Sequence, residues 1–258
     1  MELAAVLRDS FKMLRSHPKM FLPRMLTTAL YTIFTLYSIG ITADFVLMKD
    51  PEMVSVFLWK TAILFAALPL LYVVDILSYA MYPRMVADLK SSGDVGLSLA
   101  LKDALKAWKV VLALGCAVFA SLVFVSTVAA FFQILHALTG FFAFTVLAAL
   151  SGIALIIAFS VFVFFVVPMA VLEGKGVNDS FRNSFKLGLE NWKELTGLNS
   201  LFAFLALSTM ILVLTAEIND SLTLISLSAF ALARMVQAVV YTYLSVVNPA
   251  VYLLVRVK

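Results

Sequence analysis

The sequence predicts an all-α fold: a six-helix transmembrane bundle with three short cytoplasmic amphipathic helices, built from three two-span repeats. The first observation is composition, because 63% of the 258 residues are hydrophobic and only 13% are charged, whereas soluble domains are about half apolar and a quarter charged. The second is that several apolar runs exceed the roughly 18 to 20 residues needed to cross a bilayer. The third is a short basic motif that occurs three times. Together they exclude an ordinary soluble domain.

The first element is predicted in residues 1 to 19, where apolar side chains recur at three- and four-residue spacing. Arg8, Lys12 and Arg15 lie on the opposite side. This pattern is typical of a helix that lies in the membrane interface. The apolar members are Leu3, Val6, Leu7, Phe11 and Leu14.

Six apolar runs follow, and each is interpreted as a membrane span. Short polar turns join them in pairs, so the members of each pair are expected to be antiparallel neighbours. Pro83, Pro168 and Pro249 stand at the ends of the second, fourth and sixth runs, where we expect the helices to end or bend. The predicted spans are Leu26 to Met48, Val56 to Tyr82, Val110 to Ile134, Phe141 to Val167, Leu198 to Thr215 and Leu222 to Val247.

Lysine and arginine are distributed unevenly between the two sides that these spans imply. Sixteen lie in the terminal segments and the loops after the second and fourth spans, against Lys49 and Lys60 on the other side and Arg234 within a span. Cytoplasmic segments of membrane proteins carry the excess of positive charge. The distribution therefore predicts a multi-pass plasma-membrane protein with both termini in the cytoplasm.

The basic motif reads LRDSFK at Leu7 to Lys12, LKDALK at Leu101 to Lys106 and FRNSFK at Phe181 to Lys186. The motifs are 94 and 80 residues apart, and the three prolines 85 and 81. These periods predict repeats at about 1–90, 91–174 and 175–258 within one integral membrane domain, related by a pseudo-threefold axis or a looser duplication. The alternative is that the cytoplasmic joins of unrelated helical membrane proteins look alike.

Two ionisable residues fall inside predicted spans, Asp75 and Arg234. Each costs about 2.5 to 3.5 kcal/mol at a bilayer centre, so both are expected to face the bundle interior or each other. Counted back from Pro83 and Pro249, their depths differ by seven residues, or about 10 Å. They are interpreted either as an interhelical pair or, with Gln237, as part of a polar substrate path.

The cytoplasmic joins carry the other candidate site, since basic side chains there would stand at headgroup depth. Near an anionic surface each contributes about 1 kcal/mol. These residues therefore predict binding to anionic lipid headgroups, with ordinary positive-inside patterning as the alternative. The basic residues are Arg8, Lys12, Lys102, Lys106, Lys175, Arg182 and Lys186, and the tryptophans expected at the interface are Trp108 and Trp192.

No catalytic, cofactor or metal motif is found in the sequence. HExxH, GxSxG and GxxxxGK[ST] are missing, and each would mark a specific chemistry. The single Cys116 and the separate His17 and His136 offer no ligand cluster. We therefore expect no catalytic residues, no metal, no cofactor and no nucleic-acid partner.

Two runs, PMAVLEGKGVNDSFRNSFKLGLENWKELTGL at 168–198 and LRDSFKMLRSHPKMFLP at 7–23, resemble a group of archaeal and bacterial polytopic membrane proteins. That group includes the membrane domain joined to some glycerophosphodiester phosphodiesterases. The resemblance implies a six-helix membrane module and carries over no hydrolase residues.

The function that we expect is a non-enzymatic membrane scaffold or accessory protein. Its expected partners are anionic lipids of the cytoplasmic leaflet, a membrane or cytoplasmic protein, or both. The main alternative is a transporter or lipid-moving protein with a central polar path through Asp75 and Arg234. Packed apolar side chains at the centre would argue against that path, whereas a wet cavity that reaches Asp75 would argue for it.

Overall fold

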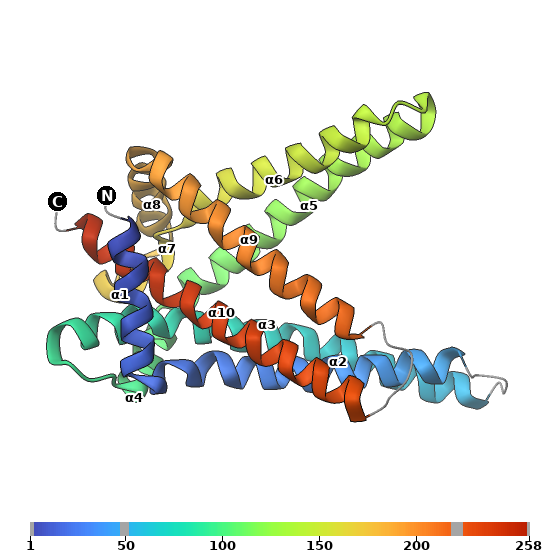
Figure 1. The fold of residues 1–258 in the computed structure, drawn as a ribbon, viewed down its shortest axis with the longest axis horizontal. Helices are drawn as coiled ribbons and strands as arrows, with labels where there is room; N and C mark the ends of the chain where they lie inside the picture. The colour runs from blue at the N-terminus through green and yellow to red at the C-terminus, as the bar shows by residue number, and fades with distance from the viewer. Residues whose placement is uncertain (1–2, 47–51, 218–223, 257–258) are drawn as a thin grey trace.

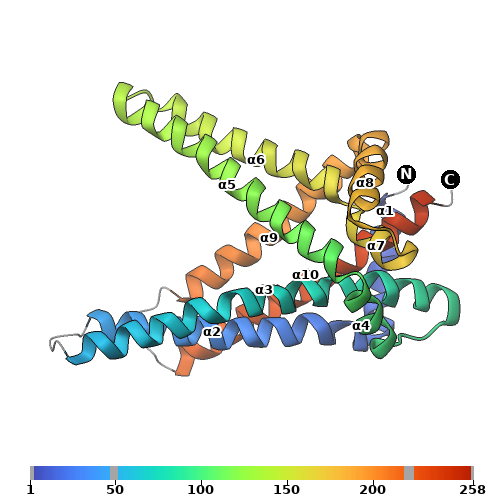
Figure 2. The same ribbon diagram turned by 180° about the vertical axis from the view of Figure 1, so that it is seen from behind.

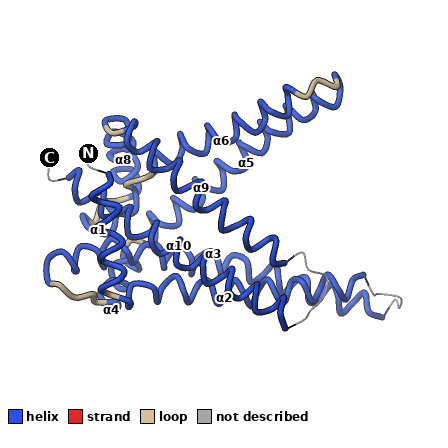
Figure 3. Tube along the Cα trace, viewed as in Figure 1, coloured by secondary structure: helices blue, strands red, loops and turns tan. Residues whose placement is uncertain are grey.

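The computed structural model describes residues 3–46, 52–217 and 224–256, and within them every regular element is a helix (Figure 3). In chain order these elements are α1 (Leu3–Ser16), η1 (Pro18–Phe21), α2 (Leu22–Val46), α3 (Glu52–Ser92), α4 (Leu97–Lys106), α5 (Trp108–Thr139), α6 (Ala143–Val163), α7 (Val166–Glu173), α8 (Val177–Glu190), α9 (Trp192–Glu217) and α10 (Leu224–Arg256).

Three pairs of long helices, α2 with α3, α5 with α6 and α9 with α10, pack side by side. Figure 1 and Figure 2 show that the pairs meet at one end of the molecule and spread apart toward the other, where α5 and α6 diverge from the rest. The short helices α1, α4 and α8 and the end of α10 all lie where the pairs meet. We call this the basic end, because it carries the repeated basic motif.

Among the described residues, five helical segments are long and apolar enough to cross a membrane, so the architecture is that of a polytopic membrane protein. The helix α2 is not among them, although it has 25 residues. The predicted count of six spans is thus supported for five, and α2 as the sixth remains a prediction. The five segments are Val54–Ser92, Trp108–Thr139, Ala143–Glu173, Trp192–Thr215 and Leu227–Arg256.

Pro83 and Pro249 do not end their helices. The helix α3 continues through Pro69 and Pro83 to Ser92, and α10 continues through Pro249 to Arg256. Proline removes one backbone donor but can remain inside a membrane helix where neighbours cover the freed carbonyl. Both Pro83 and Pro249 lie in closely packed surroundings, flanked by the buried residues Tyr82 and Asn248, and this packing keeps the helices continuous.

The chain does break before Pro168, between α6 and α7, and side chains from elsewhere take up the exposed backbone groups. The hydroxyl of Ser184 donates to the carbonyl of Phe162 at 2.8 Å and accepts from the amide of Phe165 at 3.1 Å. The amide of Asn248 donates to the carbonyl of Phe164 at 2.7 Å. Since buried backbone groups require partners, α8 and α10 stabilise this break.

The core lies where α3, α7 and α10 meet near these prolines. Apolar side chains of these three helices form its centre, and residues of α1, η1, α4, α5, α6 and α9 also belong to it. Phe165 and Tyr252 pack there with ring centroids 5.6 Å apart. The centre of the basic end is therefore filled by side chains. The largest fully buried members are Tyr82, Tyr252, Phe165, Met20, Met85, Leu195, Val86, Val166, Val167, Val246, Val247 and Val251.

Each short helix of the basic end docks on the second helix of a long pair. The helix α4 packs on α3, α8 packs on α6 and α7, and α1 packs on α10. In each case the fourth residue of the basic motif, Ser10, Ala104 or Ser184, is completely buried. A small side chain lets the two backbones approach closely. The same seam thus occurs three times, and α1 closes the ring by contacting the last helix.

Candidate functional site

A buried ion pair joins the first turn of α2 to the middle of α3. The guanidinium of Arg24 donates to the carboxylate of Asp75, and its Nε donates to the hydroxyl of Ser245 at 3.2 Å. The same guanidinium lies 5.6 Å from the ring centroid of Tyr79. The side chain of Arg24 is 11% exposed and that of Asp75 is 33% exposed. Asp75 thus has a cationic partner within the bundle, as an intramembrane carboxylate requires.

The expected pair of Asp75 with Arg234 is wrong, because Arg234 lies at another depth. Its Nη2 donates to the hydroxyl of Thr35, at 2.7 Å. Thr35 and Arg24 are eleven residues apart on α2, which corresponds to about 16 Å along a helix. The side chain of an arginine does not reach that far, so the two sites are separate.

Sequence reasoning placed Arg24 in the cytoplasmic arm because the first span was started at Leu26. One feature of the sequence, Pro23, indicates that the helix starts before Arg24. Pro23 is the second residue of α2, and proline is favoured in the first turn of a helix. Had the predicted first span begun at Pro23, Arg24 would have been assigned to the span.

Polar side chains follow one face of α10 from Arg234 toward the basic end. Arg234 donates to the amide oxygen of Gln237 at 3.0 Å, and Gln237 lies 3.4 Å from the hydroxyl of Tyr241. Ser245 comes next, donates to the carbonyl of Tyr241 at 2.7 Å and accepts from Arg24. The spacing of three and four residues keeps these groups on one side of the helix. We call these four residues the polar stripe.

Comparisons with protein-family models, with curated proteins and with solved structures found no match for this chain. The resemblance to membrane domains joined to phosphodiesterases therefore stays a prediction. Function has to be argued from the sites themselves.

The basic end presents charged and apolar side chains together. At the second and sixth positions of the motif, the basic residues are exposed on α1, α4 and α8. At the fifth position, Phe11 is 62% exposed, Leu105 49% and Phe185 48%. The buried residues of α1 are Val6, Ser10 and Leu14, so Phe11 is the large apolar residue of this helix that stays outside. The exposed basic residues are Arg8, Lys12, Lys102, Lys106, Arg182 and Lys186.

Trp108 and Trp192 also belong to this surface. Each is the first residue of a long helix and is 52% exposed. The ammonium of Lys109 lies 5.9 Å from the ring of Trp108, and that of Lys193 lies 5.7 Å from the ring of Trp192. Tryptophan beside lysine is typical of a membrane interface.

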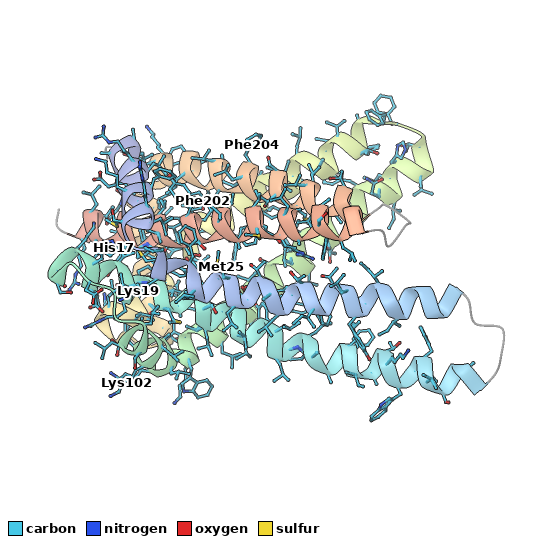
Figure 4. The ribbon with its side chains drawn as sticks, turned by 60° about the horizontal axis from the view of Figure 1, so that its bottom comes forward. His17, Lys19, Met25, Lys102, Phe202 and Phe204 are labelled. Carbon is cyan, nitrogen blue, oxygen red and sulfur yellow. The ribbon has the colours of Figure 1, made fainter. Side chains whose placement is uncertain are left out.

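Lys175 forms an ion pair within the protein, as does Lys106, whose partner Asp103 lies on the same helix. Its ammonium lies 2.7 Å from Glu173, whose carboxylate also accepts from Tyr252 and lies 3.2 Å from Arg256. This cluster joins the end of α7 to the end of α10. Lys175 therefore has a structural partner, whereas Lys102 is exposed at the basic end (Figure 4).

The loop before α4 is held by Asp94, which lies 3.7 Å from the ammonium of Lys19. The backbone amide of Val95 and then the charge of Lys19 lower the pKa of Asp94 from its usual value. In the described ranges, no group of three or more His, Cys, Asp or Glu residues could hold a metal ion.

Proposed function

We propose that this chain is a non-enzymatic membrane scaffold or accessory protein that binds anionic lipid through its basic end. In this proposal α2 is the sixth span, the long pairs are three repeats, and the basic end faces the cytoplasmic leaflet of the plasma membrane. The observation that carries the proposal is the exposed mixture of motif cations with Phe11, Leu105 and Phe185 on three separate helices. An interfacial helix binds by burying such apolar side chains among acyl chains while its cations meet phosphates.

The filled centre of the basic end supports a scaffold more than a channel. Tyr82, Phe165 and Tyr252 occupy the place where α3, α7 and α10 meet. Arg24 and Asp75 are paired with each other, and Arg234 is engaged at another depth. A substrate path through Asp75 and Arg234 would require the bonds of Asp75 to Arg24 and of Arg234 to Thr35 to break.

A second candidate, a lipid-moving protein, is favoured by one observation, the polar stripe on α10. A stripe of hydroxyl, amide and guanidinium groups inside an apolar bundle is expensive, and such a stripe can guide a headgroup. The candidate is tested in proteoliposomes by the rate at which a fluorescent phospholipid becomes accessible to an aqueous quencher. We expect the rate of protein-free vesicles, and an acceleration that Gln237→Leu abolishes would favour transport.

Neutralising Lys102 and Lys106 is expected to reduce the local concentration of anionic lipid around α4. Two charges at about 1 kcal/mol each correspond to roughly thirtyfold. Because Lys106 is already paired with Asp103 at 2.8 Å, we expect about tenfold. The measurement is quenching of Trp108, in protein whose other tryptophans are phenylalanine, by brominated phosphatidylglycerol diluted in phosphatidylcholine nanodiscs.

The matched control retains only Trp59, which is 70% exposed and lies in the first turns of α3, at the other end of the bundle. Its quenching should not respond to the lysine substitutions. High salt should remove most of the effect at Trp108, because exposed charges are screened beyond about 10 Å at 0.1 M salt. A response of Trp108 that is independent of salt, or equal for brominated phosphatidylcholine, would contradict the proposal.

A further inference from the structure

A chamber of about 380 Å³ lies among the long helices, next to the filled core. It receives side chains from α2, α3, α5, α6, α7, α9 and α10. Its volume falls in the range of about 300 to 1,000 Å³ that is typical of small-molecule sites. At the end nearest the core it is closed by Val167 and Asn248, which are 1% and 3% exposed. At the opposite rim, Leu122 and Ile156 are 49% and 42% exposed, so the chamber opens outward between spans.

The closed end contains a polar group that lacks a partner. Asn199 lines the chamber and is only 7% exposed, yet the nitrogen of its amide has no hydrogen-bond partner among the described residues. An unpaired buried donor costs about 1 to 3 kcal/mol. Because Asn199 lines the chamber, a polar group bound there would be the partner for this nitrogen. A buried amide in this state indicates a ligand that supplies the missing bond.

Arg24 also lines the closed end, and its charge is already balanced. Its bonds to Asp75 and Ser245 use two of its five N–H groups; the others have no partner among the described residues. The guanidinium can therefore donate to a ligand, while Asp75 neutralises its charge. A second buried anion would lack a counterion and would be costly. These groups favour an uncharged head that carries hydroxyl and carbonyl oxygens.

The wall between the closed end and the rim is apolar. Leu114, Val118, Phe159 and Phe202 line it. Figure 4 shows Phe202 and Phe204 on different sides of α9, and Phe204, which does not line the chamber, is 67% exposed. Aliphatic and aromatic walls favour an alkyl chain. Because the rim lies on candidate spans, such a chain could continue from the chamber into the bilayer.

We propose that the chamber binds one molecule of a neutral, hydroxyl-bearing lipid, with its head at Asn199 and Arg24 and its chain along α5, α6 and α9. The shared chemistry is a hydroxylated head on an alkyl chain, which a glycerol ester or a long-chain alcohol could supply. This site is separate from the exposed cations of the basic end and does not depend on the proposal made for them.

The test uses native mass spectrometry of the full-length protein in a nonionic detergent with probes that share one eighteen-carbon chain. Monoolein and oleyl alcohol represent the two sources, methyl oleate lacks a hydroxyl group, and oleate carries a charge. We expect one saturable site at which monoolein or oleyl alcohol binds at least tenfold more tightly than methyl oleate and oleate. The tighter of the two hydroxylated probes identifies the source.

Two substitutions locate the site. Asn199→Leu should weaken binding of the preferred probe about tenfold while leaving the melting temperature unchanged or higher, because it removes a buried nitrogen that had no partner. Ser160→Phe should fill the chamber and abolish binding. The matched control is Ser208→Phe, since Ser208 is an exposed serine with the same bond to the carbonyl four residues earlier, and it lies outside the chamber.

Equal binding of methyl oleate, or tighter binding of oleate, would overturn the proposal. So would binding of the hydroxylated probe that neither Asn199→Leu nor Ser160→Phe reduces. Neutralising Lys102 and Lys106 should leave monoolein binding unchanged, so failure at the chamber can be told apart from failure at the basic end.

Discussion

Replacing Arg24 with glutamine is expected to destabilise the protein more than any other single change of charge. Removing one partner of a buried ion pair costs about 3 to 5 kcal/mol, because the other charge is left buried. Asp75 is one-third exposed, so we expect the lower end, about 3 kcal/mol. Thermal unfolding in detergent should show a large drop in melting temperature for Arg24→Gln and a smaller drop for Asp75→Asn.

A double-mutant cycle separates the pair from its surroundings. Arg24→Gln combined with Asp75→Asn should cost less than the sum of the two single changes, with a coupling of about 1 to 3 kcal/mol. The matched cycle combines Asp75→Asn with Arg234→Gln, which lie at different depths, and should be additive within about 0.5 kcal/mol. Coupling in the second cycle and additivity in the first would show that Asp75 pairs with Arg234 after all.

The fold class could be predicted from the sequence because long apolar runs and short polar turns are local features. The boundaries of the helices could not, because they depend on neighbours. Pro83 continues a helix since its surroundings are packed, whereas the break before Pro168 relies on Ser184 and Asn248 from other helices. A proline alone does not reveal which outcome applies.

The candidate sites also divide into those that local spacing predicts and those that depend on packing between helices. The exposed cations of the basic motif were predicted by periodicity, because the side of a helix follows from spacing alone. The partner of Asp75 was not, since a pair between helices depends on their relative depth. The chamber was also beyond prediction: Asn199, Phe202 and Leu122 each resemble ordinary residues of a span, and only the packing of three helix pairs places them around one space.

Enlarging Gly188 is expected to undock α8 from α6. A Cβ atom at this position would lie 2.6 Å from the carbonyl oxygen of Val161, which is backbone and cannot rotate away. Overpacking of this kind costs about 1 to 3 kcal/mol. Gly188→Ala should therefore lower the melting temperature, even though alanine is the better helix former by up to about 1 kcal/mol.

Gly197 is the matched control, because it lies in α9 with no atom within 4 Å of the position that a Cβ would occupy. Gly197→Ala should leave the melting temperature unchanged or raise it. Ser184→Ala provides an independent measure of the same contact, since it removes the hydroxyl that bonds to Phe162 and Phe165 and leaves two buried backbone groups unpaired, at about 1 to 3 kcal/mol each. If Gly188→Ala and Ser184→Ala both behave like Gly197→Ala, α8 is not held against α6 by this seam. If both destabilise, Ser184 and Gly188 fix α8 to α6 and so keep Phe185 and the cations of this helix facing outward.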